Sequence, residues 1–171
     1  MDILKKNFFE LFNIDIAVDI NKSELDEKVK ALQIKFHPDK FASGSDVEKR
    51  LALQLSSHIN DGYKILSDIV LRIEYILKIN NFVKDESKTI NDASFLQEQI
   101  EYNELEESLK EYYDDDLVRN HLNKIKLLLK NSIEDIKLSF KSKDYETMWQ
   151  HLSKLRFYIK NINNLIKMRK S

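Results

Sequence analysis

The sequence is poor in the residues that cross-link a chain or interrupt its helices. Among 171 residues there is no cysteine, one proline (Pro38) and two glycines (Gly44 and Gly62). The absence of cysteine excludes disulfides, thiolate metal sites and thiol catalysis. Because proline and glycine are the weakest helix formers, their scarcity predicts long helices with few breaks.

Signals of secreted, membrane and nucleic-acid-binding proteins are also missing. No apolar run approaches the length of a membrane span, and the first residues, MDILKKNFFELF, lack the pattern of a signal peptide. The formal net charge is −1, so no basic field draws the chain to nucleic acid or to a membrane. There is no glycine-rich phosphate loop, so we expect no direct ATP binding. We expect a cytoplasmic protein, and the abundance of Lys, Asn and Ile favours a bacterial source.

Helical periodicity is the main feature that the sequence does contain. Hydrophobic residues make up 42% of the chain and charged residues 33%, which suits helices with one buried and one exposed face. The N-terminal part has a short aromatic cluster, two long apolar stripes and a shorter amphipathic piece, residues 70–79. The cluster is Phe8, Phe9, Leu11 and Phe12; the stripes are Leu25, Val29, Leu32 and Phe36, then Leu51, Leu55, Ile59, Gly62 or Tyr63, and Leu66. Asn21 or Ser23 can cap the first long helix, and Asp46 can cap the second.

Three further amphipathic patterns follow a polar stretch without periodicity, residues 80–91. They cover residues 92–113, 117–141 and 144–168. The second has its stripe at Val118, Leu122, Ile125, Leu129, Ile136 and Phe140, and the third at Tyr145, Trp149, Leu152, Ile159, Ile162 and Ile166. The sequence therefore predicts an all-α protein: an N-terminal helical hairpin (residues 1–79), a linker (80–91) and a C-terminal three-helix bundle (92–171).

A polar loop separates the two long N-terminal helices. Residues 36–45 read FHPDKFASGS, and Pro38 restricts His37, so a helix that reaches His37 should end there. The Ser-Gly-Ser that follows supplies turn and cap residues before the next helix. We therefore expect His37, Asp39 and Lys40 at the tip of a tight loop. Gly62, inside the second helix, permits the close approach of a neighbouring element.

A helix with basic residues, then His37-Pro38-Asp39, then an antiparallel helix resembles the J-domain of co-chaperones. Residues 59–66, INDGYKIL, resemble the IN-x-A-Y-x-x-L pattern of the helix after that loop. The segments HPDKFASGS, RIEYIL (72–77), ASFLQEQ (93–99) and KLRF (154–157) extend the similarity to the HscB family, over nearly the whole chain. In one departure, the family's usual proline after the aspartate at position 68 is replaced by Ile69.

The resemblance implies a non-enzymatic co-chaperone of iron–sulfur cluster biogenesis, with residues 1–79 as its J-domain. It would stimulate the ATPase of an HscA- or DnaK-type chaperone and deliver the scaffold protein IscU to it. The implied chaperone-binding residues are Lys28, Lys30, Lys35, His37, Pro38, Asp39 and Lys40. The implied scaffold-binding residues are Leu96, Gln97, Ile100, Glu101, Glu104 and Phe157. We expect a monomer that holds no cofactor and no metal, and that binds neither nucleic acid nor membrane.

The scaffold-binding face also has support from helical phase. Phe95, Tyr102, Leu105, Leu109 and Tyr112 share one stripe, the expected core face of the first C-terminal helix. Leu96 and Ile100 lie roughly opposite, with Glu101 and Glu104 beside them. An apolar centre with a carboxylate rim suits a partner with an apolar patch and basic residues. Phe157 lies off the stripe of the third helix, so we expect that Leu96, Ile100 and Phe157 do not fill the core.

Other interpretations remain open at this stage. His37 and Asp39 could form an acid–base pair, although no nucleophile or pocket accompanies them. The remaining histidines, His58, His121 and His151, lie on separate helices without metal-ligand spacing. A general J-protein for unfolded clients is an alternative of the same class. A structural helical protein with a chance His-Pro-Asp sequence is an alternative of a different class.

Overall fold

The computed structural model describes residues 3–84 and 92–169, and the regular secondary structure of those parts is helical. The chain divides into two compact units, residues 1–81 and 82–171. Most of the expected linker, residues 85–91, lies outside the described residues. The prediction of an all-α fold is confirmed.

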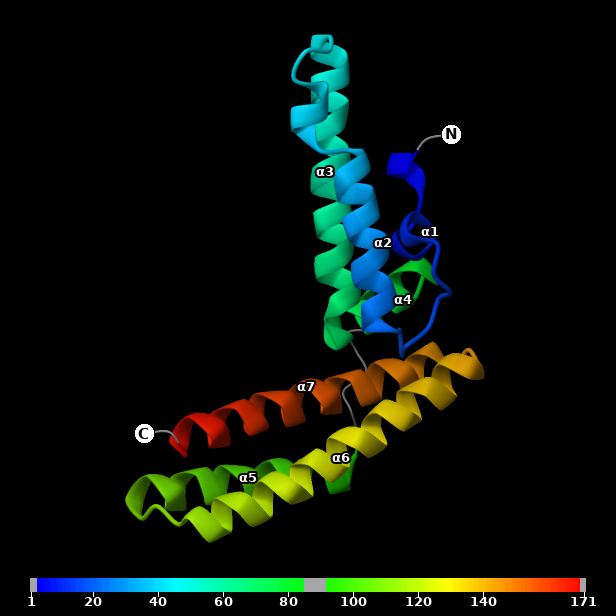
Figure 1. The fold of residues 1–171 in the computed structure, drawn as a ribbon. Helices are drawn as coiled ribbons and strands as arrows, with labels where there is room; N and C mark the ends of the chain where they lie inside the picture. The colour runs from blue at the N-terminus through cyan, green and yellow to red at the C-terminus, as the bar shows by residue number, and fades with distance from the viewer. Residues whose placement is uncertain (1–2, 85–91, 170–171) are drawn as a thin grey trace. The chain divides into compact units, whose positions relative to one another are not determined.

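The first unit is built on a hairpin of two long helices (Figure 1). It contains the 3-10 helix η1 (Ile3–Lys5), α1 (Phe8–Phe12), α2 (Lys22–Lys35), the 3-10 helix η2 (Pro38–Phe41), α3 (Asp46–Ser67) and α4 (Ile69–Ile79). Asn21 caps α2, as one of the two expected residues. Ser45, and not Asp46, caps α3, because its side chain accepts the amide of Glu48 while that glutamate bonds back to the Ser45 amide.

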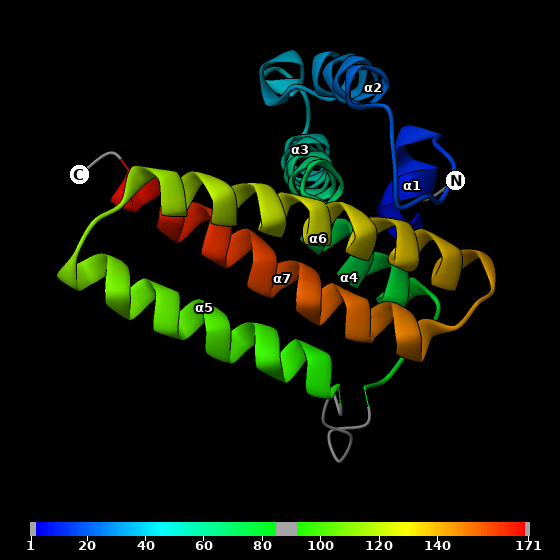
Figure 2. The same cartoon turned by 90° about the horizontal axis from the view of Figure 1, so that it is seen from below.

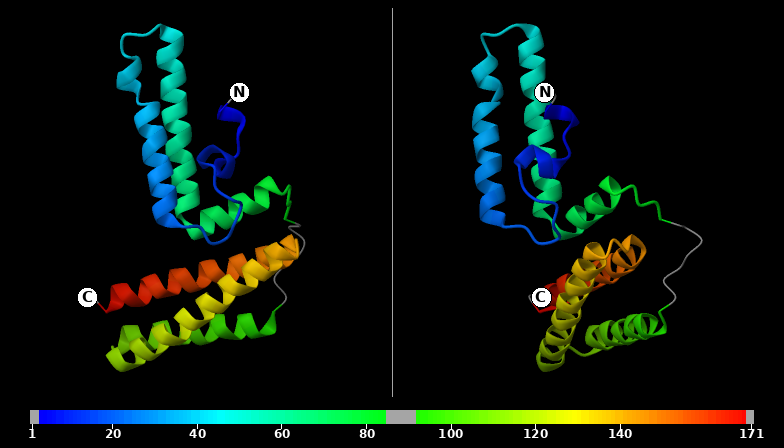
Figure 3. Two further views of the ribbon diagram at one scale, coloured as in Figure 1. Left: turned by 45° about the vertical axis from the view of Figure 1, so that its right-hand side comes forward. Right: turned by 90° about the vertical axis from the view of Figure 1, so that its right-hand side faces the viewer.

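The short helix α1 packs against α3, and Figure 3 shows it beside the hairpin. The contact explains Gly62, because a Cβ there would lie 2.8 Å from Cδ1 of Phe8 and 2.9 Å from Cε2 of Phe12. The expected close approach at Gly62 is confirmed. Leu51, assigned to the core stripe of α3, is instead exposed, and Ala52 is buried in its place, one residue further around the helix.

Arg72 ties three parts of the first unit together. It is 7% exposed; its Nε donates to the Val18 carbonyl at 2.8 Å, and its guanidinium also donates to the Leu66 carbonyl. Burial lowers the pKa of the guanidinium, and the charges of Asp19 and Asp68 oppose that effect. The side chain thus joins the loop before α2 to the end of α3 from its place on α4.

Replacement of Arg72 by Met should lower the free energy of unfolding of the first unit by about 2–4 kcal/mol. The methionine fills similar space but leaves the buried carbonyls of Val18 and Leu66 without a donor. A urea titration followed through amide signals of residues 1–81 measures the loss. Arg50→Met, at an exposed position of α3, is the matched control. Equal stability of the two variants would contradict this role of Arg72.

The turn between α3 and α4 forms without a proline after Asp68. Asp68 is extended, with φ −95° and ψ 127°, and its carboxylate accepts the amide of Leu71 at 2.9 Å. An aspartate at this position can therefore cap α4 by itself.

The described part of the second unit contains three helices: α5 (Ala93–Glu111), α6 (Asp115–Lys141) and α7 (Tyr145–Met168). The helices α6 and α7 pack along one another, and Figure 2 shows α5 lying beside the pair. The core that joins all three includes Phe95, Tyr102 and Leu109 from α5. From α6 and α7 it includes Val118, Leu122, Ile125, Tyr158 and Leu165.

Two expectations about the second unit are wrong at the level of single residues. Tyr112 is 79% exposed, because α5 ends at Glu111 and the backbone of Tyr112 is extended. The buried face of α7 is also broader than the expected stripe. It consists of Met148, Leu152, Leu155, Tyr158, Asn161 and Leu165, while Ile166 is exposed. The physical reason is that α7 faces α6 on one side and the aromatic residues of α5 on another.

Candidate functional site

The His-Pro-Asp loop lies at the tip of the α2–α3 hairpin (Figure 1). Helix α2 ends at Lys35, and His37 has the extended conformation that a following proline favours, with φ −60° and ψ 129°. Pro38 opens η2, and Nδ1 of His37 accepts the amide of Asp39 at 3.3 Å. The side chains of His37 and Asp39 are 57% and 91% exposed. The loop therefore presents both groups to solvent, as the sequence predicted.

The other side of the loop is held by Ser45 and Glu48. The Ser45 amide and hydroxyl both donate to Oε2 of Glu48 at 2.8 Å, and these bonds lower the pKa of that carboxyl. A Cβ on Gly44 would lie 2.9 Å from the same oxygen. Sequence reasoning missed Glu48, although the Ser-x-x-Glu spacing is the signal of this capping box. The loop is thus anchored at both ends while its tip stays accessible.

The lysines expected to bind a chaperone do not share one face of α2. Lys28 and Lys35 are two turns apart on the same side, whereas Lys30 lies about 160° around the helix from Lys28. Nζ of Lys28 is also occupied: it donates to the Asn13 carbonyl at 2.6 Å and to Glu24 at 2.5 Å. Lys30, Lys35 and Lys40 are exposed. These three ammonium groups are therefore accessible to a partner, although Lys30 and Lys35 lie on different sides of α2.

The outward face of α5 has an apolar centre with polar residues around it. Leu96 and Ile100, one turn apart, are 58% and 44% exposed. Gln97, Glu101 and Glu104 are exposed beside them. The helical phase predicted for Leu96, Ile100, Glu101 and Glu104 is therefore confirmed. We call this set the α5 face.

Phe157 does not extend this face in the way that the sequence suggested. It is partly buried and packs against the core of the second unit. Its ring meets those of Phe95 and Tyr102 edge-on, with centroids 5.4 Å and 5.8 Å apart. The expectation that Phe157 does not fill the core is wrong, because α7 turns this position toward α5 rather than toward solvent.

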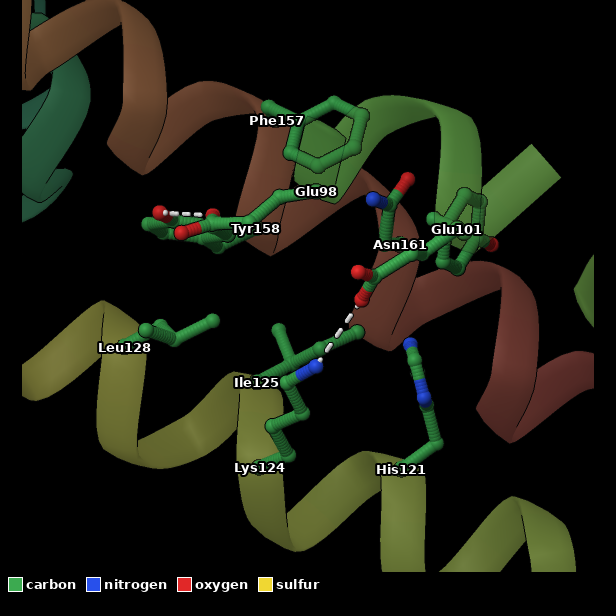
Figure 4. Close-up of a pocket in the computed structure, with 10 residues that line it drawn as sticks. Glu98, Glu101, His121, Lys124, Ile125, Leu128, Phe157, Tyr158 and Asn161 are labelled. Atoms are coloured by element: carbon green, nitrogen blue, oxygen red, sulfur yellow. Dashed lines mark hydrogen bonds and ion pairs between the residues drawn. The ribbon is translucent and has the colours of Figure 1, made fainter. Parts of the chain in front are cut away.

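Beneath the α5 face, side chains from all three helices converge on a small pocket (Figure 4). Tyr158 donates its hydroxyl to Glu98 at 2.6 Å, and Lys124 donates to Glu101 at 3.1 Å. Burial raises the pKa of Tyr158, and the bond to Glu98 raises it further. Nδ2 of Asn161, a residue 1% exposed, points into this region without a hydrogen-bond partner. The cavity is about 10 Å³, room for one water molecule, so it is too small for an organic substrate.

The described residues contain no cluster of the kind that holds a metal ion. Nδ1 of His37 and Oδ2 of Asp39 are 3.6 Å apart on an exposed loop, and neither residue lines the small pocket beneath the α5 face. No group of three potential metal ligands occurs within residues 3–84 and 92–169. Burial lowers the pKa of both His121 and His151, which lie in separate surroundings on α6 and α7. No helix in those ranges is long and apolar enough to cross a membrane.

Comparison with known proteins identifies the family. Residues 91–167 match a family model described as the HSCB C-terminal oligomerisation domain. A co-chaperone protein HscB homologue of Neisseria meningitidis serogroup A is 35% identical over 159 residues, which cover 92% of this chain and 96% of that protein. The chain belongs to the HscB family of co-chaperones. The HscB homologue of Shewanella amazonensis is 41% identical over 104 residues, and that alignment spans 60% of each protein.

Solved structures of HscB proteins share the fold. The chaperone HscB from Vibrio cholerae superposes with a TM-score of 0.84 and 27% identity, over 96% of this chain and 98% of that one. Human co-chaperone protein HscB gives a TM-score of 0.81 and 28% identity, over 97% of this chain and 83% of that one. The resemblance drawn from the loop and helix motifs is therefore confirmed. The relatives are named co-chaperones, which agrees with a role other than catalysis.

Proposed function

We propose that the chain stimulates ATP hydrolysis by an HscA- or DnaK-type chaperone and delivers an IscU-type scaffold to it, so that iron–sulfur proteins mature. The observation that carries the proposal is the exposed His37-Pro38-Asp39 tip, anchored at both ends, in a chain of the HscB family. Residues 1–79 act as a J-domain, whose contacts with the chaperone come from this tip and from Lys30, Lys35 and Lys40. Lys28 plays a smaller part, because it is already bonded to Asn13 and Glu24.

The C-terminal three-helix bundle, residues 92–171, carries the scaffold on the α5 face. Exposed Leu96 and Ile100 supply an apolar centre, and Glu101 and Glu104 supply negative charge for a basic partner. Because both modules belong to one chain, a bound scaffold is presented to the chaperone at a high effective concentration. The chain thus acts by bringing two proteins together.

The test is a single-turnover ATPase assay of the purified chaperone with this chain alone, with the scaffold alone and with both. Stimulation by the chain that rises further with the scaffold supports the proposal. A pull-down from cell extract separates the alternatives. Recovery of many unrelated clients would favour a general J-protein, and recovery of neither chaperone nor scaffold would favour a structural protein.

Charge reversal at Lys30 or Lys35 should weaken coupling to the chaperone roughly three- to ten-fold, measured as the concentration for half-maximal ATPase stimulation. Rising salt should mimic the effect, because exposed charges are screened. Lys22→Glu makes the same charge change at the far end of α2 and is the control. If the concentration for half-maximal stimulation changes neither with salt nor with the two substitutions, Lys30 and Lys35 are solvent-exposed residues without a role in chaperone binding.

A further inference from the structure

One carboxylate of the α5 face is already occupied within the molecule. Oε2 of Glu101 accepts Nζ of Lys124 at 3.1 Å, and Oε1 accepts Nε2 of Gln97 at 3.4 Å. Glu104, one turn nearer the end of the helix, makes no such contact among the described residues. At the rim of the α5 face, the Glu101 carboxylate is thus already bonded within the protein, whereas the Glu104 carboxylate is available to a partner.

The engaging cation comes from another helix. Lys124 lies on α6, and its side chain and that of Glu101 are 55% and 44% exposed, so the pair is at the surface beside Ile100. The bond from Lys124 is the main reason that the pKa of Glu101 is lowered, with Gln97 second. The same ammonium adds to the effect of burial in lowering the pKa of His121. Lys124 therefore places a positive charge against the negative rim.

A second lysine of α6, Lys126, can be compared with Lys124. Lys126, two residues further along α6, is also exposed but lies about 160° around the helix from Lys124. It makes no hydrogen bond or ion pair with α5 among the described residues. The two lysines thus carry equal charge on one helix, and Lys124 alone of the two meets the α5 face.

We propose that Lys124 is an intramolecular competitor at the scaffold-binding face: its ammonium occupies the Glu101 carboxylate that a basic side chain of the scaffold would contact. This role rests on the proposed function of the α5 face. A cationic partner residue must displace Lys124 or bind beside it, and in both cases part of the attraction is cancelled. Lys124 thereby limits affinity and favours partners whose apolar patch fits Leu96 and Ile100 over partners that are merely basic.

Lys124→Gln should tighten binding of the purified IscU-type scaffold about two- to five-fold at low salt, the range expected for an exposed ion pair. The dissociation constant of the variant should also depend more steeply on salt, because a freed carboxylate adds an intermolecular charge contact. Lys126→Gln, with the same loss of charge, should bind like the wild-type chain. In a Glu101→Gln background, Lys124→Gln should give no additional gain, since the group for which Lys124 competes is gone.

Calorimetric titration of the full chain with the scaffold measures these affinities, and NMR titration of Glu101 tests the ion pair without a partner. In Lys124→Gln the pKa of Glu101 should rise toward its ordinary value. Equal gains for Lys124→Gln and Lys126→Gln would show a net-charge effect and overturn the competitor role. Unchanged or weaker binding by Lys124→Gln, or an unmoved pKa of Glu101, would also overturn it. Failure of the wild-type chain to bind the scaffold would instead overturn the proposed function, and the competitor role with it.

Discussion

His37→Gln should abolish stimulation of the chaperone's ATPase while leaving the helices intact. The imidazole is at an exposed loop tip, and its contacts in the described structure stay within the loop: Nδ1 accepts the Asp39 amide, and the ring lies near the Asp39 carboxylate. Loss of such a local cap should cost at most about 1 kcal/mol of stability. The His37 imidazole thus contributes little to the stability of the fold. Its exposed position beside Pro38 and Asp39 allows it to contact a partner.

Circular dichroism and a single-turnover ATPase assay measure the two halves of this prediction. Ser43→Ala, an exposed change in the same loop, is the control and should stimulate like the wild-type chain. Binding of the scaffold to the second unit should be unaffected by either substitution. Undiminished stimulation by His37→Gln would remove the proposed role of the loop, even if the chaperone still bound elsewhere.

Combined replacement of Leu96 and Ile100 by alanine should weaken scaffold binding by about 2–4 kcal/mol, if each side chain contributes as an interface hot spot. Their exposure means that little burial is lost in the free protein, so stability should change by less than about 0.5 kcal/mol per site. Stimulation of the chaperone by the chain without scaffold should be preserved. Calorimetric titration against the scaffold, with thermal melts alongside, tests both parts.

The matched control is Leu127→Ala with Leu138→Ala. These two leucines are 60% and 65% exposed, so the control removes similar apolar surface from α6 rather than from α5. Phe157→Ala should act on stability rather than on scaffold binding alone. It removes the aromatic contacts with Phe95 and Tyr102 and should lower the free energy of unfolding by about 1–3 kcal/mol. Normal scaffold binding by a stable Leu96→Ala/Ile100→Ala variant would place the partner surface elsewhere.

The loop and the α5 face could be predicted from the sequence because both depend on local geometry. Pro38 ends a helix through its own ring and its missing amide, whatever surrounds it, so the position of the His-Pro-Asp tip followed directly. In α5, the stripe of Phe95, Tyr102 and Leu109 set one buried direction, and Leu96 and Ile100 were therefore outside it. Helical phase is a reliable guide where a helix buries a single face.

Only the tertiary structure decided the features that depend on two elements at once. Phe157 was misplaced because α7 buries residues against both α6 and α5, so that its buried arc is wider than one stripe. The sequence placed Lys28 among the chaperone-binding cations, but in the structure its ammonium donates to the Asn13 carbonyl in the loop after α1. The pairing of Lys124 with Glu101 joins residues far apart in the sequence and has no periodic signal. By itself the sequence determined which segments are helical and where the chain turns, because backbone restrictions and periodicity act within a few residues. Whether an exposed charged side chain forms an ion pair or hydrogen bond was decided by packing, because it depends on the distance to a group on another part of the chain.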